Sequence, residues 1–91
     1  MVKLVVSFNF NDKNDIPQAV NALRGMSGKI DGMLSIEVGE DIINSCDVVL
    51  ICTFQNAQAL GDYQDHPAHT PVKTMLNSMI KSATASAFLT H

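Results

Sequence analysis

The chain has 91 residues, of which 46% are hydrophobic and 16% are charged. This length predicts a single domain, residues 1–91, that can bury only about 60 to 65% of the unfolded chain's surface. Nine acidic and six basic residues give a net charge of -3, and the scattered bases exclude a basic patch for nucleic acid or anionic lipid. So many apolar and so few charged residues predict that part of the surface is an interface.

The sequence predicts a soluble protein with reduced cysteines. Its longest apolar run, Val48 to Cys52, is much shorter than the roughly 20 residues of a membrane-spanning helix. The first residues have neither the charged leader nor the apolar stretch of a signal peptide. Cys46 and Cys52 would lie about 20 Å apart along an extended strand, which is too far for a disulfide between them. Reduced thiols indicate a cytoplasmic location.

Hydrophobic periodicity predicts the first three elements. In residues 2–10, VKLVVSFNF, alternate residues are apolar, as in a strand. The polar residues 11–15 predict a turn and an N-cap, and the helix that follows is expected to continue to about Met26 and to end near Gly28. The period then returns to two, so that Leu34, Ile36 and Val38 are expected on one face of a second strand.

The third predicted strand, residues 47–54, is apolar on both faces. One face carries Val48, Leu50, Cys52 and Phe54, and the other carries Val49, Ile51 and Thr53. Such a strand needs cover on both sides of the sheet, whereas the few helices of so short a chain can cover one side well. A second molecule is therefore the expected cover of the other side.

Two helices and a last strand complete the prediction. Residues 57–63 have helical spacing, and the corner Asp65-His66-Pro67 is expected to end that helix because a residue before proline is disfavoured in the helical region. A longer helix is predicted from about Pro67 to Lys81, followed by a strand from Ala83 to Thr90. The apolar stripe of the long helix is Val72, Leu76, Met79 and Ile80, while Lys73, Asn77 and Lys81 are expected to face solvent. The order β-α-β-β-α-α-β predicts an α+β, ferredoxin-like fold with a four-stranded antiparallel sheet.

The stretch YQDHPAHTPV, residues 63–72, holds the one tyrosine and two of the three histidines. His69 lies three residues before Val72, so it shares the apolar stripe that faces the sheet. Tyr63 follows Leu60 by three residues and is expected on the inward side of the short helix. An imidazole and a phenol that face one apolar cavity suit general acid-base chemistry on a small carbonyl or phenolic ligand. Tyr63 and His69 are therefore the candidate catalytic residues.

Two other interpretations of this stretch stay open. Tyr63 and His69 could serve only to hold the corner through backbone carbonyls, as buried polar groups commonly do, and His66 before Pro67 suits such a structural role. A metal site would use both histidines and a neighbouring aspartate, but no distant histidine or cysteine supplies a third ligand, so no metal is predicted. Glycine-rich phosphate loops and nucleophile elbows are absent from the sequence, and no cofactor is predicted.

Four segments together resemble one known family. They are MVKLVVSFNF, GKIDGMLSIEVG, VVLICTF and LGDYQDHPAHTPV. Over nearly its whole length the chain is similar to the stress-responsive dimeric A/B barrel domain (Dabb) family, and the tyrosine followed by His-Pro-Ala-His is the most specific part. The resemblance implies a homodimeric α+β barrel, in which two ferredoxin-like sheets pack face to face and a small pocket lies between helices and sheet.

The resemblance also implies roles for particular residues. Plant polyketide cyclases of this family use a tyrosine and the second histidine of the motif as an acid-base pair, matching Tyr63 and His69. Family members commonly have a histidine where this chain has Leu4, and the cyclases have another where it has Val48. Leu4, Val48 and His66 are expected to line a pocket that is more apolar than that of the cyclases.

The leading hypothesis is a cytoplasmic, homodimeric, stress-responsive Dabb-domain protein with a small hydrophobic ligand pocket. As an enzyme it would perform cofactor-independent cyclase or lyase chemistry on a polyketide-like ligand, with His69 as base and Tyr63 as oxyanion donor. One alternative is a non-catalytic stress-response or ligand-binding protein in which the corner residues only hold the helices. Another is a cofactor-free monooxygenase, which rests on analogy between dimeric α+β barrels.

Overall fold

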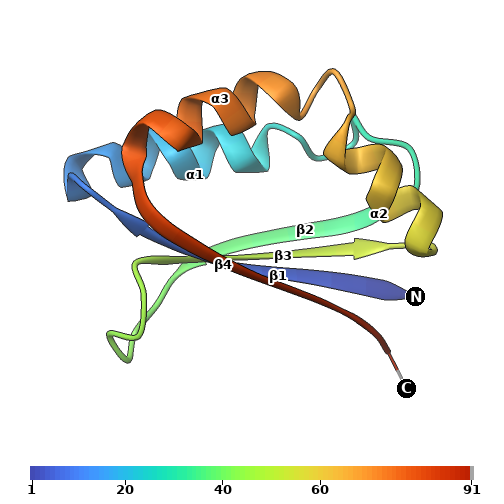
Figure 1. Ribbon diagram of the computed structural model, residues 1–91, viewed down its shortest axis with the longest axis horizontal. Coiled ribbons are helices and arrows are strands. Elements are labelled where there is room, and N and C mark those ends of the chain that lie inside the picture. The colour runs from blue at the N-terminus through green and yellow to red at the C-terminus, as the bar shows by residue number, and fades with distance from the viewer. Residues whose placement is uncertain (91) are drawn as a thin grey trace.

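The computed structural model describes residues 1–90, and His91 lies outside the described residues. A four-stranded antiparallel sheet, ordered β2-β3-β1-β4, has its helices on one face (Figure 1). The strands are β1 (Val2–Phe10), β2 (Met33–Glu40), β3 (Val48–Phe54) and β4 (Ile80–Leu89). The helices are α1 (Ile16–Arg24), α2 (Ala57–Gln64) and α3 (Thr70–Met79), and a 3-10 helix, η1 (Lys13–Asp15), precedes α1. This is the predicted ferredoxin-like α+β fold, and none of the helices within residues 1–90 is long and apolar enough to span a membrane.

The core lies between the helices and the covered face of the sheet. Antiparallel pairing of β1 with β3 sets Leu4 opposite Cys52 and Val2 opposite Phe54, and all four side chains are buried. The helix side of the core includes Ala19, Leu23, Ala59, Tyr63 and Leu76. Because side chains alternate along a strand, the neighbours of these strand residues point to the opposite face.

No helix within residues 1–90 covers that opposite face, which we call the open face (Figure 1). Val5 lies opposite Ile51 there, and Ser7 lies opposite Val49. These four residues are only half-buried, whereas Thr53 beside them is buried. The prediction that β3 is apolar on both faces beneath a single helix layer is confirmed.

The predicted face of Leu34 was wrong. The pairing of β2 with β3 changes register between Met33 and Ser35, and Leu34 at this irregularity is 50% exposed. Met33 packs against the core in its place, together with Ile36 and Val38. An extra residue in one strand reverses the alternation of faces, so a strict period of two does not hold across it.

The first helix ends earlier than predicted. α1 stops at Arg24 with Gly25 as its C-cap, rather than near Gly28. Met26 is nevertheless 1% exposed, because the turns after the helix keep it against the core. Gly28 and Gly32 occupy positive φ values of 77° and 81° in these turns, where a residue with a Cβ would be strained.

Both ends of the long helix were predicted wrongly. α3 begins at Thr70 rather than Pro67 because residues 67–69 form a turn. It ends at Met79 because Ile80 is already extended and pairs with Phe10, so β4 starts before the predicted Ala83. The Asn11 backbone N–H donates to the Met79 carbonyl at 3.0 Å, which joins the end of this helix to the end of β1.

Candidate functional site

A cavity of about 380 Å³ lies between the covered face of the sheet and helices α2 and α3. Its apolar lining is Leu4, Val6, Phe8, Leu23, Leu50, Leu76, Ile80, Ala83 and Ala85. Its polar lining is Tyr63, Gln64, Asp65, His69, Lys73 and Asn77, all from α2, α3 and the corner between them. An apolar space with polar groups on one side is the usual form of a small-molecule site, and this one is near the lower end of the common range of about 300 to 1,000 Å³.

Small side chains on β4 help to leave this space open. Ala83 pairs with Phe8 and Ala85 pairs with Val6, so both alanines lie on the covered face of the sheet. Opposite Val6 and Phe8 of β1, β4 carries only the methyl groups of these two alanines. This edge of the sheet therefore forms a wide part of the cavity wall rather than a filled part of the core.

The corner between α2 and α3 orients the two candidate catalytic side chains. The His66 backbone carbonyl accepts the His69 N–H at 2.9 Å, and His66 Nδ1 accepts the Ala68 N–H at 3.0 Å. These contacts agree with the structural role expected for His66 in the turn. His66 is not among the residues that line the cavity, because its ring is engaged by the turn.

Tyr63 and His69 stack against each other at the cavity wall. Their ring centroids are 4.2 Å apart, and the angle between the ring planes is 23°. Tyr63 is 3% exposed and also packs on Phe54, with 5.2 Å between centroids. His69 is half-buried at the N-cap of α3. The tertiary structure thus brings the two predicted residues together, beside Leu4, in one cavity.

The surroundings of His69 favour a neutral ring with one nitrogen able to accept a proton. Its Nδ1 lies 3.4 Å from the Gln64 carbonyl oxygen, and a carbonyl can only accept, so the hydrogen belongs on Nδ1. Burial lowers the pKa of His69, the nearby Lys73 charge adds to this, and the Gln64 carbonyl opposes it. At neutral pH the remaining nitrogen, Nε2, therefore carries a lone pair, as a general base must.

The Tyr63 side chain is held as a neutral phenol. Burial raises its pKa above the usual value of a tyrosine, and the nearby Cys52 contributes in the same direction. None of the hydrogen bonds within residues 1–90 involves the Tyr63 hydroxyl, so this donor is available to a ligand in the cavity. Burial also raises the pKa of Cys52 to about 12, which keeps it a protonated thiol and a poor nucleophile.

Val48, the remaining residue expected in the pocket, lies outside it. Val48 pairs with Phe8 at the start of β3 and has no exposed surface. Its side chain is enclosed by the core, and it is not among the residues that line the cavity.

Lys73 and Asn77 are exposed, as predicted for the solvent side of the helix, and they also line the cavity. The Lys73 ammonium lies 3.4 Å from the Gln64 carbonyl oxygen, at the polar side of the site. The signal was present in the spacing, because residues four apart on a helix share a face and His69, Lys73 and Asn77 are separated by four residues each. These two side chains can meet a polar group of a ligand whose apolar part occupies the cavity.

The described residues do not form a metal site. Within residues 1–90, no three histidine, cysteine, aspartate or glutamate side chains come together in a group that could hold a metal ion. The chemistry that this cavity itself provides is that of an imidazole, a phenol, two amides, a carboxylate and an ammonium group.

The chain matches one protein family over most of its length. The model of the stress responsive A/B barrel domain (Dabb) matches residues 2–88. No curated protein matches the chain.

Solved structures with the same architecture share little sequence with it. A protein from Arabidopsis thaliana is 19% identical, with 100% of this chain and 96% of that chain covered and a TM-score of 0.89. A dimeric ferredoxin-like protein of unknown function from Thermobifida fusca is 20% identical, with 98% and 90% covered and a TM-score of 0.87. A variant of SnoaB, a cofactor-independent oxygenase from Streptomyces nogalater, is 13% identical, with 99% and 92% covered and a TM-score of 0.83. At these identities the likeness shows the fold alone.

Proposed function

Because the chain belongs to the stress responsive A/B barrel domain family, we propose that it is a homodimer that binds a small hydrophobic carbonyl or phenolic ligand beside Tyr63 and His69. The observation that carries this proposal is the stacked tyrosine and histidine on the wall of a cavity of about 380 Å³ whose sheet side is apolar. The free thiols Cys46 and Cys52 fit a cytoplasmic location for this protein.

The proposed reaction is cofactor-independent acid-base chemistry of the cyclase or lyase type. Neutral His69 removes a proton from a carbon next to the ligand carbonyl, using Nε2, and the Tyr63 hydroxyl donates to the oxygen that becomes negative. The enolate carbon then attacks a second carbonyl carbon of the ligand, whose π bond opens to an alkoxide, or the enolate expels a leaving group. The protonated His69 gives its proton to that alkoxide or leaving group, which restores the neutral base.

The homodimer is supported by the open face of the sheet. Val5, Val49 and Ile51 lie on that face and are only half-buried, with no helix of residues 1–90 above them. Three solved structures of the same fold are of proteins described as dimeric. A second copy on the open face would remove these apolar side chains from water.

The ligand proposal is tested by a thermal-shift screen of small aromatic and polyketide-like compounds. A compound that raises the melting temperature is then assayed for turnover with Tyr63→Phe and His69→Gln. We expect Tyr63→Phe to lower kcat about 10- to 1,000-fold and His69→Gln by a similar factor, because each removes one half of the acid-base pair.

Comparing substitutions of the two histidines distinguishes a ligand-binding role from a purely structural role in the corner. His66→Ala is expected to destabilise the turn and to leave ligand affinity and turnover within about threefold, since His66 does not line the cavity. If His69→Gln and His66→Ala both lowered the melting temperature and neither altered ligand binding, both histidines would only hold the corner. That outcome would support the non-catalytic alternative.

Oxygenase chemistry is the second candidate, and the observation in its favour is the likeness to the cofactor-independent oxygenase SnoaB. At 13% identity this likeness concerns the fold, so the activity is carried over by analogy only. Oxygen consumption with the same panel of phenolic compounds distinguishes it, because a cyclase or lyase consumes none.

A further inference from the structure

The loop between β2 and β3, residues 41–47, carries the two most exposed large hydrophobic side chains within residues 1–90. Ile42 is 92% exposed and Ile43 is 76% exposed. Single apolar residues on a surface are ordinary, but two adjacent isoleucines at the tip of a loop form a patch that removal from water would stabilise.

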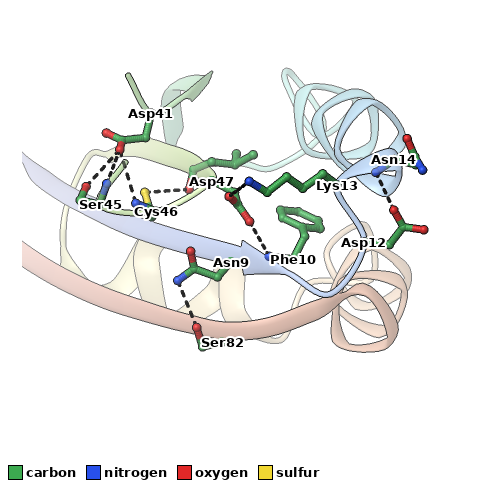
Figure 2. Close-up of polar contacts among 11 residues, drawn as sticks. Asn9, Phe10, Asp12, Lys13, Asn14, Asp41, Ser45, Cys46, Asp47 and Ser82 are labelled. Carbon is green, nitrogen blue, oxygen red and sulfur yellow. Dashed lines mark hydrogen bonds and ion pairs between the residues drawn. The ribbon is translucent and has the colours of Figure 1, made fainter. Parts of the chain in front are cut away.

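The loop holds this patch in place through its own hydrogen bonds. One Asp41 carboxylate oxygen accepts the Ser45 N–H at 2.7 Å, the Ser45 hydroxyl at 3.2 Å and the Cys46 N–H at 3.4 Å (Figure 2). The Ser45 N–H contributes most to lowering the pKa of Asp41, so the carboxylate is charged at neutral pH. The Asp41 carboxylate therefore closes the loop by hydrogen bonds, and Ile42 and Ile43 take no part in these bonds.

The base of the loop is joined to β1. The Asp47 N–H donates to the Phe8 carbonyl at 2.9 Å. An Asp47 carboxylate oxygen accepts the Phe10 N–H at 2.8 Å (Figure 2). Asp41 and Asp47 also bond to each other through the backbone at 3.1 Å. With both ends fixed to the sheet, the loop presents Ile42 and Ile43 in a defined direction.

That direction is the helix-free side of the sheet. The loop extends away from the helices and beyond the open face (Figure 1). A hollow at the base of the loop is lined by Ile42 together with Val49 and Ile51 of the open face. The isoleucine tip is thus continuous with the surface that the second copy of the proposed homodimer would cover.

We propose that this loop is a clasp between subunits. In the dimer, Ile42 and Ile43 of each copy pack against the surface of the second copy beside its open face. The inference rests on the homodimer of the proposed function and adds an interface element beyond the sheet faces. A two-fold dimer makes each contact twice, so one loop per subunit gives two clasps per dimer.

The charge around the loop disfavours an anionic lipid surface as its occupant. Residues 33–47 contain Glu37, Glu40, Asp41 and Asp47 and no lysine or arginine. Anionic lipid attracts basic segments and repels acidic ones, so isoleucines in this setting are poorly suited to insert into such a membrane.

The test measures the dimer dissociation constant by sedimentation velocity over a concentration series. We expect Ile42→Ser/Ile43→Ser to raise it at least about tenfold, since burial of either isoleucine in a contact would be worth at least that factor. The matched control is Ile42→Val/Ile43→Val, which keeps most of the apolar area and is expected to stay within about threefold of the wild type. Thermal unfolding of both variants at a concentration where all are monomers is expected to match the wild type, because the two side chains contact little within their own chain.

The outcomes separate the clasp from the homodimer. A wild-type dimer whose dissociation constant is unchanged by the serine pair overturns the clasp and leaves the homodimer intact. A wild-type chain that is monomeric at about 100 μM overturns the homodimer and the clasp with it. Co-sedimentation with phosphatidylcholine or phosphatidylserine vesicles that requires Ile42 and Ile43, with the dimer unaffected, would assign the loop to lipid instead.

Discussion

The corner at residues 65–69 and the loop at residues 41–47 are both short, polar connections. They differ in the side chains that they leave free, which are polar rings at the corner and apolar isoleucines in the loop. In the loop, the carboxylates of Asp41 and Asp47 accept backbone N–H groups, and apolar Ile42 and Ile43 face outward. In the corner, backbone bonds to the His66 carbonyl complete the turn, and the rings of Tyr63 and His69 face the cavity. In a cluster of polar residues, therefore, only the side chains that are not needed to hydrogen-bond the backbone are free to act on a ligand.

The comparison also separates two kinds of exposure. The rings of Tyr63 and His69 lie between the helix layer and the sheet, where burial shifts the pKa of Tyr63 upward and that of His69 downward. The loop lies beyond the sheet on its helix-free side, where its exposed side chains can contact another molecule (Figure 1). Three changes test this division, from the largest expected effect to the smallest.

Removing the Tyr63 ring should have the largest effect. Tyr63→Ala deletes an aromatic side chain that is 3% exposed and packs on Phe54 and His69, so the free energy of unfolding should fall by about 3 to 5 kcal/mol. Tyr63→Phe should cost less than about 1 kcal/mol, since it keeps the ring and removes a hydroxyl that makes no hydrogen bond within residues 1–90. Urea unfolding measures both. A loss of several kcal/mol in the phenylalanine variant would mean that the hydroxyl is structural and not reserved for a ligand.

Removing the Asp47 carboxylate should have an intermediate effect confined to stability. Asp47→Ala leaves the Phe10 N–H without its acceptor, which should lower the free energy of unfolding by about 1 to 3 kcal/mol. Asp47→Asn keeps an oxygen acceptor and loses only the ion pair with Lys13, which is 3.9 Å long and involves a lysine that is 80% exposed. It should therefore cost less than about 1 kcal/mol, and equal losses in the two variants would show that charge dominates instead.

The pH dependence of stability should show the smallest effect. The pKa of His69 is lower in the folded chain than its ordinary value of 6.5, because burial opposes the charged ring. The folded state then binds fewer protons than the unfolded state, so this contribution is complete above pH 6.5 and is lost as the pH falls through the lower folded value. Urea unfolding between pH 8 and pH 5 should show a steeper loss for the wild type than for His69→Gln. Parallel curves for the two proteins would contradict the buried, neutral His69 on which the proposed mechanism depends.

The local sequence pattern was enough to predict the number, order and type of the main elements and the inward position of Tyr63 and His69. The pattern failed at residues whose conformation or exposure depends on a neighbour in space rather than in sequence. Ile80 has helical spacing with Leu76, but it becomes extended because it pairs with Phe10. Leu34 follows the strand period, but the change of register in β2 leaves it half exposed.

Sequence by itself determined the direction of three side chains: the pattern placed Tyr63 and His69 inward and His66 in the turn. Tertiary structure alone decided that the two rings stack. It also decided that the alanines of β4, far away in the chain, hold the cavity open. The physical reason is that periodicity reports which way a side chain points within its own element, whereas a cavity depends on the volumes of side chains that several elements bring together.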